Sequence, residues 1–278
     1  MIRSERLTTI LDTIADTGTV TVEQLVDDLD ISPATARRDL DALAERGLLR
    51  RTRGGARSNI VAFDTPVRQK RMQQLTEKTT IARHCLNYLE PGCVVGMSGG
   101  STVGTIAQQL VEWAAEQSPN DVPTNYPVVT VVTNAIDIAY LLAGSTNMKI
   151  VLIGGVLNGN SYELTGPLGA TVLGQLSMDV AFIGANGIDE NGPGTVDEFE
   201  AQTNRMMATR AITPVVVADH AKFGRRSFSS LGGIDTVNTI VTDSDVDPAW
   251  TQRLTQLGYN VIIAHQDAGT PSAQRSAV

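Results

Sequence analysis

A regular alternation of short apolar runs with amphipathic segments occupies most of the chain after Thr79, and it constrains the fold more than any other feature. The apolar runs have the length of strands, and apolar residues recur at helical spacing in the segments between them. Apolar strands separated by helices are typical of a parallel sheet covered on both faces. We therefore predict an α/β domain with strands over 93–97, 128–132, 149–153, 180–183, 215–218, 239–242 and 261–264, and helices over 81–89, 103–115, 136–143, 168–176, 199–212 and 248–257.

A smaller pattern of three short helices precedes this domain. Apolar residues at helical spacing predict the first helix over 4–15. Thr21 opens the second helix, with Gln24 as its partner in a possible capping box. After a very short turn, Ser32 can cap the third helix while Pro33 takes its first position. Two helices joined so tightly are typical of a helix-turn-helix.

The third helix has two contrasting faces. Its apolar residues at helical spacing are Ala36, Leu40 and Leu43. Thr35, Arg37 and Arg38 then point away from the core, near the N-terminus of the helix. A major groove accepts this shape, and Arg can serve a phosphate or a guanine. Taken alone, the helix could equally be an ordinary amphipathic helix with a solvated surface.

A short basic segment follows the third helix. The stretch 48–57 is too short and too rich in glycine for another helix, so we predict a strand, a tight turn and a returning strand, which together form a wing. The chain has a net charge of -8, yet 46–57 contains five Arg and no carboxylate. Phosphate attraction depends on such a local patch, because salt screens charges beyond about 10 Å. The net acidity therefore does not exclude DNA binding.

These two stretches resemble the signature of the DeoR family of bacterial transcription regulators. The matching residues are 32–40, Ser-Pro-Ala-Thr-Ala-Arg-Arg-Asp-Leu, and 47–56, Gly-Leu-Leu-Arg-Arg-Thr-Arg-Gly-Gly-Ala. The chain departs from the family at Ala36, where Ile is usual, and at Arg53, where His is usual. We predict that DNA is contacted by Thr21, Ser32, Pro33, Ala34, Thr35, Arg37, Arg38, Arg50, Arg51, Arg53, Gly54 and Gly55.

Loops that follow strands carry the candidate ligand site of the larger domain. Ligands of parallel sheets bind at the carboxyl ends of the strands. The loop 96–102 offers glycines, hydroxyls and a helix N-terminus, which together suit a phosphate; a glycine-rich turn without a ligand is the alternative. Thr133 and Asn134 could touch a ligand or cap the next helix, and Lys222 could pair with a phosphate or lie on the surface. The predicted effector residues are Ser98, Gly99, Gly100, Ser101, Thr102, Thr133, Asn134, Gly154, Gly155, Asn186, Gly187, Asp189, Glu198 and Lys222.

The same loops extend the DeoR resemblance over nearly the whole chain, to about Asp243. The matching pieces are 131–134, 153–155, 182–187 and 219–224. The resemblance implies a fold similar to sugar-phosphate isomerases such as ribose-5-phosphate isomerase, and a domain that senses a phosphorylated sugar. At the first loop Met97 replaces the Asp that the family typically shows, so the effector can differ from the usual ones.

A working isomerase is the rival hypothesis for this domain. Moving a proton between sugar carbons needs a carboxylate base beside the substrate. The isomerases carry acids in an Asp-Gly-Ala-Asp-Glu segment, whereas 183–187 reads Ile-Gly-Ala-Asn-Gly. Asp189 and Glu198 are then expected to bind sugar hydroxyls. We predict sensing, and robust turnover of pentose or hexose phosphates would favour the isomerase instead.

The remaining expectations concern organisation. We predict a DNA-binding domain over 1–57, a linker over 58–78, a sensing and oligomerisation domain over 79–265 and a disordered tail over 266–278. Whether the linker charges touch DNA stays open. The sequence predicts a cytoplasmic protein without a membrane span, a cofactor or a metal site. Paired half-sites favour a homo-oligomer, a dimer or tetramer, acting as a repressor on double-stranded operator DNA.

Overall fold

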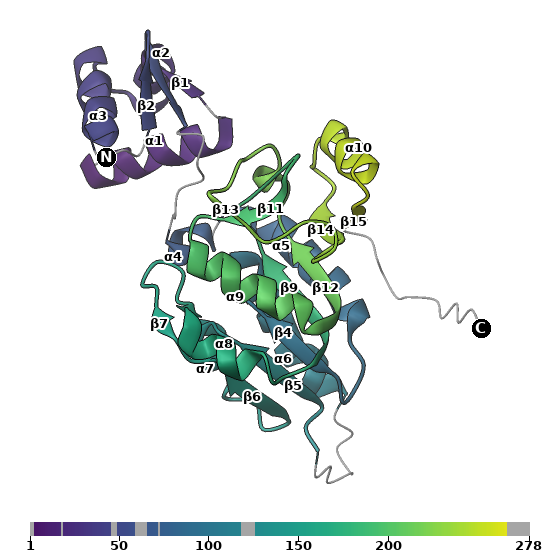
Figure 1. Cartoon of the computed structure of the whole chain (residues 1–278). Coiled ribbons are helices and arrows are strands. Elements are labelled where there is room, and N and C mark those ends of the chain that lie inside the picture. The colour runs from purple at the N-terminus through teal and green to yellow at the C-terminus, as the bar shows by residue number, and fades with distance from the viewer. Residues whose placement is uncertain are drawn as a thin grey trace. The chain divides into compact units, whose positions relative to one another are not determined.

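A computed structural model describes residues 3–17, 19–45, 49–58, 66–71, 73–117 and 126–265. The chain forms two compact units, Met1–Phe63 and Asp64–Val278 (Figure 1). The predicted tail, 266–278, lies outside the described residues.

The first unit combines three helices with a small antiparallel sheet. The helices are α1 (Arg3–Thr17), α2 (Val22–Leu29) and α3 (Pro33–Glu45). The strands β1 (Thr19–Thr21), β2 (Leu49–Thr52) and β3 (Gly55–Ser58) pair in the order β1-β3-β2. Side chains from all three helices, among them Ile10, Leu25 and Leu40, share one buried core. The predicted helix-turn-helix and wing are confirmed, and β1 is an addition, since three residues are too few to show a strand pattern.

Local hydrogen bonds explain where α2 and α3 begin. The hydroxyl of Thr21 accepts a hydrogen bond from the N–H of Gln24 at 3.1 Å, and the N–H of Thr21 donates to the Gln24 side chain at 2.8 Å. This is the predicted capping box. At α3 the Ser32 hydroxyl accepts from the N–H of Thr35 at 3.2 Å, and Pro33 is the first helical residue. Both helix starts are as predicted.

The second unit is built on a seven-stranded parallel sheet (Figure 1). Its strands are β4 (Val94–Met97), β5 (Val129–Thr133), β6 (Met148–Leu152), β9 (Met178–Gly184), β12 (Ala211–Val217), β14 (Thr239–Asp243) and β15 (Asn260–Ala264). They lie in the order β15-β14-β12-β9-β4-β5-β6, and neighbouring strands are parallel throughout. The predicted α/β fold class is confirmed.

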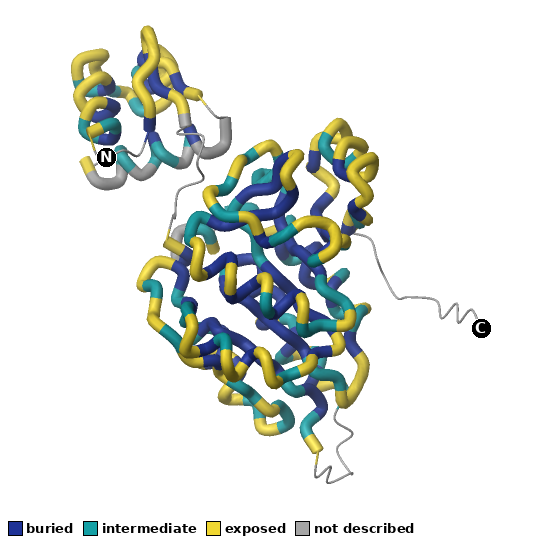
Figure 2. The backbone as a smooth tube through the Cα atoms, viewed as in Figure 1, coloured by how far each residue is buried: buried dark blue, intermediate teal, exposed yellow. Residues whose placement is uncertain are grey.

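Helices cover both faces of this sheet. They are α5 (Leu75–Cys85), α6 (Ser101–Glu116), α7 (Ile136–Leu142), α8 (Pro167–Leu173), α9 (Glu198–Thr209) and α10 (Pro248–Gln256). Alternate strand residues fill opposite cores, because side chains of a strand point to opposite faces. Val215 and Val217 pack with residues of α5, α6 and α7, whereas Val216 packs with residues of α8, α9 and α10. The central strands of the sheet are therefore deeply buried, whereas the edge strands β6 and β15 are partly exposed (Figure 2).

Several details differ from the prediction. The helix predicted over 199–212 ends at Thr209, because Ala211 already pairs with Met178 in the sheet. A three-stranded antiparallel sheet of β10 (Gly187–Asp189), β11 (Gly192–Thr195) and β13 (Ser229–Ser230) was not predicted, nor was the hairpin of β7 (Val156–Leu157) and β8 (Leu164–Thr165). These strands are too short for a period-two pattern.

The segment predicted as a linker over 58–78 is partly folded. It contains the one-turn helix α4 (Val67–Lys70) and the start of α5, and both belong to the second unit. Val67 is buried, and its N–H donates to the carbonyl of Asn160 at 2.9 Å. Lys78 is also buried. A single turn with one buried apolar residue leaves no periodicity in the sequence, which is why the linker prediction extended over α4 and the first residues of α5.

Candidate functional site

The exposed face of α3 carries the predicted DNA-binding residues. Arg37 and Arg38 are exposed, as are Ser32, Pro33 and Ala34 before them. The opposite face, which includes Ala36, Leu40 and Leu43, is buried. The helix therefore presents small groups and two guanidiniums to solvent at its N-terminal end, where a recognition helix contacts base edges.

The wing holds its arginines in two different ways. Arg50 and Arg53 are exposed. Arg51 lies across the wing instead, because its guanidinium donates to the carbonyl of Gly55 at 2.5 Å and contacts Asp41 of α3 at 2.8 Å. These contacts fix the wing against α3.

Three of the predicted DNA-binding residues have clear architectural roles. Thr21 caps α2. Gly54 has a φ of +100°, which suits the tight turn between β2 and β3. At Gly55 a Cβ would lie 2.0 Å from the carbonyl oxygen of Val20, so β1 and β3 can approach only with glycine there. DNA contacts by these residues stay a prediction.

Asp39, in the middle of α3, makes a buried contact that the sequence did not indicate. Its carboxylate is buried and lies 2.5 Å from the guanidinium of Arg6 in α1, with Arg3 at 3.6 Å. The hydrogen bond from Arg6 to Asp39 raises the pKa of Arg6. This pair joins α1 to the recognition helix and fixes how α3 is held.

A hollow lies at the carboxyl ends of β4, β9 and β12 in the second unit. Six predicted effector residues line it, namely Gly99, Gly100, Ser101, Thr102, Asn186 and Lys222. The polar lining residues that were not predicted are Lys70, Ser161, Glu163 and Glu200. The structure thus brings the glycine-rich loop and two lysines to one place.

The N-terminus of α6 forms one wall of this hollow. Gly100 precedes the helix with a φ of +100° and gives no side-chain cap. The first N–H groups of a helix have no acceptor within it, and the helix dipole makes this end positive. Ser98 stands behind the loop, where its hydroxyl accepts from the N–H of Gly184 at 3.0 Å and donates to the carbonyl of Gly99 at 3.2 Å. The loop is therefore fixed from behind by a buried residue that does not line the hollow.

Glu163 is built into the same wall. Its Oε1 accepts from the N–H of Gly99 at 2.8 Å and from the amide of Asn134 at 3.3 Å. A Cβ on Gly99 would lie 2.3 Å from the Cγ of Glu163, so the two residues can pack only with glycine at 99. Burial raises the pKa of Glu163 to about 7. Asn134 and Thr133 are buried and do not line the hollow, and the Thr133 hydroxyl accepts from the N–H of Ala135 at 3.0 Å.

Besides Ser98, Thr133 and Asn134, five further predicted effector residues lie outside the lining. Gly154 and Gly155 belong to the approach of the β7–β8 hairpin, where Gly155 packs against the backbone of Thr165. Gly187 packs against the carbonyl of Arg225. Asp189 accepts from the N–H of Asn191 at 2.8 Å and so closes the turn between β10 and β11. Glu198 is exposed at the start of α9.

The unpredicted lining residues carry only weak signals in the sequence. Lys70 lies in the segment taken as a linker, and Ser161 and Glu163 lie in a loop whose hairpin is too short to recognise. Glu200 is two residues beyond Glu198 in α9, so it faces a different side of the helix. Asp197 caps α9 by accepting from the N–H of Glu200 at 2.8 Å, but the sequence does not show which side of this helix faces the hollow.

A third polar cluster surrounds His220 in the 3-10 turn η2 (His220–Lys222). Ligand-type atoms of His220, Asp243 and Asp245 lie within 4.8 Å of one another. Asp243 is already engaged, since it accepts from the backbone and ring nitrogens of His220 at 2.8 and 2.9 Å and from the N–H of Asp245 at 3.0 Å. These bonds fasten η2 to the end of β14.

The raised pKa of Glu163 predicts a pH-dependent stability. A carboxyl group whose pKa is raised by folding contributes stability below its unfolded pKa, and this contribution is lost as pH rises through 7. The free energy of unfolding of Glu163→Gln, relative to that of wild type, should therefore rise as the pH is increased from 4.5 to 8, by up to roughly 3 kcal/mol. Urea unfolding of both proteins at pH 5 and pH 8 measures the change. An equal difference at the two pH values would contradict it.

Two family models match this chain. A model of the DeoR-like helix-turn-helix domain matches residues 6–60, and a model of the DeoR C terminal sensor domain matches 73–244. The HTH-type transcriptional regulator GlpR of Haloferax volcanii is 31% identical over 264 residues, which cover 94% of this chain and 98% of that protein. The glycerol-3-phosphate regulon repressor of Escherichia coli is 29% identical over 256 residues, with 92% and 96% covered.

Among solved structures, ribose 5-phosphate isomerase A from Methanocaldococcus jannaschii covers 54% of each chain at 17% identity with a TM-score of 0.38, which is too weak a likeness to carry an argument. In the part of the chain that the structure describes, no helix is long and apolar enough to cross a membrane. The family is decided by the two domain models and by the relatives, which match over almost their whole length and are named as regulators. The chain belongs to the DeoR family of transcription regulators, with a helix-turn-helix domain followed by a sensor domain.

Proposed function

We propose that this protein is a repressor of carbohydrate-metabolism genes whose binding to operator DNA is modulated by a small phosphorylated sugar or polyol. The observation that carries the proposal is the hollow of the sensor domain, where the N-terminus of α6 lies beside Lys70 and Lys222. A relative named as the glycerol-3-phosphate regulon repressor supports a phosphorylated ligand of this size.

The hollow offers complementary groups to the two ends of such a ligand. Backbone N–H groups at a helix N-terminus and lysine side chains suit a phosphate. The carboxyl groups of Glu163 and Glu200 on the lining can accept hydrogen bonds from hydroxyl groups. A phosphorylated polyol would satisfy both sets, whereas a free polyol would leave the cationic wall without its anion.

The exposed arginines favour a conventional mode of DNA binding. Arg37 and Arg38 would contact the major groove from α3, and Arg50 and Arg53 would contact the backbone from the wing. One helix and one wing cover little DNA, so the protein would act in the cytoplasm as a homo-oligomer, at least a dimer, on repeated half-sites.

A thermal-shift experiment tests the ligand class. Glycerol 3-phosphate, ribose 5-phosphate and glucose 6-phosphate are each compared with the unphosphorylated compound. At 100 times its dissociation constant a ligand stabilises the folded protein by about 2.7 kcal/mol. The Tm should therefore rise with at least one phosphorylated compound and with none of the unphosphorylated compounds. Lys222→Ala should weaken the effective ligand at least tenfold.

Lys149→Ala, which changes an exposed lysine of β6, is the matched control and should leave the shift unchanged. Equal shifts from the phosphorylated and unphosphorylated compounds would contradict the proposal, as would the absence of any shift.

A further inference from the structure

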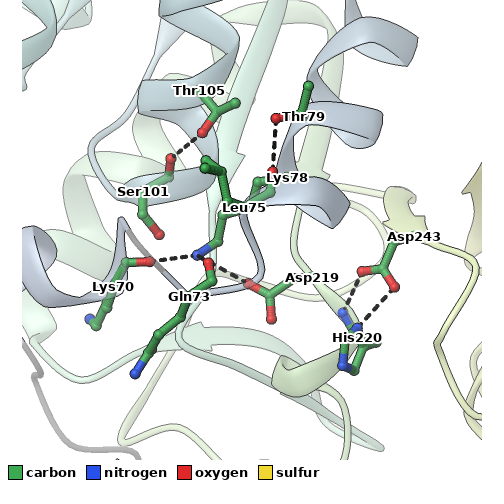
Figure 3. A network of polar contacts seen from close by, with 10 residues as sticks. All are labelled: Lys70, Gln73, Leu75, Lys78, Thr79, Ser101, Thr105, Asp219, His220 and Asp243. Atoms are coloured by element: carbon green, nitrogen blue, oxygen red, sulfur yellow. Dashed lines mark hydrogen bonds and ion pairs between the residues drawn. The ribbon is translucent and has the colours of Figure 1, made fainter. Parts of the chain in front are cut away.

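Lys78 of α5 is a fully buried lysine (Figure 3), and it contacts the backbone of Lys70, which lines the effector hollow. Its ammonium donates to the carbonyl of Lys70 at 2.7 Å and to the carbonyl of Gln73 at 2.6 Å. The third neighbour is the buried carboxylate of Asp219, 3.9 Å away. Lys78 is outside the lining of the hollow, so its role there has to be indirect.

These contacts reach the two segments that bring lysines to the hollow. Lys70 ends α4, and its side chain is part of the lining. Asp219 directly precedes η2, and its carbonyl accepts from the N–H of Lys222 at 3.0 Å. The ammonium of Lys78 is therefore shared between the segment of Lys70 and the segment of Lys222.

The charges around Lys78 make this arrangement sensitive to an anion. Burial lowers the pKa of Lys78 to about 8; Asp219 opposes this shift, while Lys222 and Lys70 add to it by repulsion. Within the described residues, neither oxygen of Asp219 has a hydrogen-bond partner. A buried carboxylate without such bonds is unfavourable. An anion in the hollow would offset the repulsion among Lys70, Lys78 and Lys222. The ammonium of Lys78 would then change its position between the carboxylate of Asp219 and the carbonyls of Lys70 and Gln73.

α4 is also the first element of the second unit along the chain, and it follows residues 59–65, which lie outside the described residues. Besides Lys78, it is held by the bond from Val67 to Asn160, close to Ser161 and Glu163 in the lining. The guanidinium of Arg71, which follows α4, pairs with Asp137. These contacts hold the N-terminal segment of the sensor domain against residues near the hollow.

We propose that Lys78 and Asp219 form a positioning pair that links occupation of the hollow to the placement of α4, and so transmits the effector signal toward the DNA-binding domain. The inference rests on the proposed function, because it needs a ligand in the hollow. In this inference the effector signal passes through two residues that the ligand does not contact.

The test uses the full chain with both members of the pair replaced. Lys78→Met alone would leave a buried carboxylate unpaired and could prevent folding, whereas replacing both charges by apolar groups of similar shape is often tolerated. The variant is therefore Lys78→Met/Asp219→Leu, and its control is Lys149→Met on the exposed surface of β6. The duplex is one selected by the wild type from a random pool.

The decisive quantity is the ratio of the DNA dissociation constants measured with and without 20 mM glycerol 3-phosphate, ribose 5-phosphate or glucose 6-phosphate. We expect a ratio of at least fivefold for the wild type and the control with one of these probes. For the double variant we expect a ratio near one, with the DNA affinity and the affinity for that probe each within threefold of wild type. A merely structural role would lower these affinities and leave the ratio intact.

A double variant that keeps the wild-type ratio overturns the inference and leaves the proposed function standing. Loss of probe binding by the folded double variant also overturns it, because the pair would then act on ligand binding itself. A wild type whose DNA binding responds to none of the probes contradicts the proposed function, and the inference falls with it. Amide hydrogen exchange over 67–74 gives a second readout, since the effective probe should change exchange there in wild type and not in the double variant.

Discussion

Arg37→Ala/Arg38→Ala is expected to lower operator affinity by at least about 30-fold, since each well-placed arginine contact is worth about 1–3 kcal/mol. Both side chains are exposed on α3 and point away from its core. Removing them should therefore leave the fold intact. Fluorescence anisotropy with the selected duplex, at two salt concentrations, measures the loss and shows a shallower salt dependence.

The control for this variant removes the same charge from the sensor domain. Arg83→Ala/Arg226→Ala changes two exposed arginines outside the first unit and should change DNA affinity by less than about threefold at moderate salt. The thermal shift with the effective phosphorylated ligand should be the same in all three proteins. A double α3 variant that binds DNA like wild type would contradict the assignment of the recognition helix.

Asp39→Asn is the second change with a large expected effect, although Asp39 is buried and cannot read DNA directly. It removes the charge that pairs with Arg6, and breaking a buried pair by changing one partner is strongly destabilising. A unit of about 60 residues has a small free energy of unfolding, so the loss of this pair should be felt across the whole unit. We expect DNA affinity to fall at least tenfold and amide protection across α1 and α3 to be lost.

Asp41→Asn is the matched control on the same helix. Asp41 is exposed, and its contact with Arg51 is a surface pair of small expected value. It should leave amide protection unchanged. Arg6→Met/Asp39→Leu, which removes both charges, should restore part of the protection lost in Asp39→Asn. Equal behaviour of Asp39→Asn and Asp41→Asn would show that the buried pair does not hold the recognition helix.

What could be predicted from the sequence is what short-range chemistry determines. The starts of α2 and α3 follow from Thr21 with Gln24 and from Ser32 with Pro33, all within a few residues of one another. The parallel sheet follows from apolar runs that are buried on both faces. The place of residues 99–102 at the hollow could be predicted because glycine, hydroxyl and helix start adjoin in the chain.

What could not be predicted depends on contacts between distant residues. Asp39 pairs with Arg6, 33 positions away, and Glu163 accepts from Gly99, 64 positions away. Lys78 looks like an ordinary residue of an amphipathic helix until α4 and Asp219 surround it. Glu198 and Glu200 differ only in the side of α9 that they face, which the sequence alone does not relate to the hollow.

The central claim is that one protein joins DNA binding by α3 to recognition of a phosphate in the hollow at the N-terminus of α6. Its most direct test is the affinity of the full chain for its selected duplex across the panel of phosphorylated and unphosphorylated sugars and polyols. We expect at least one phosphorylated compound to change that affinity fivefold or more, its unphosphorylated counterpart to have no effect, and Lys222→Ala to abolish the response. An affinity that no phosphorylated compound changes, or that the unphosphorylated compounds change equally, would contradict the account.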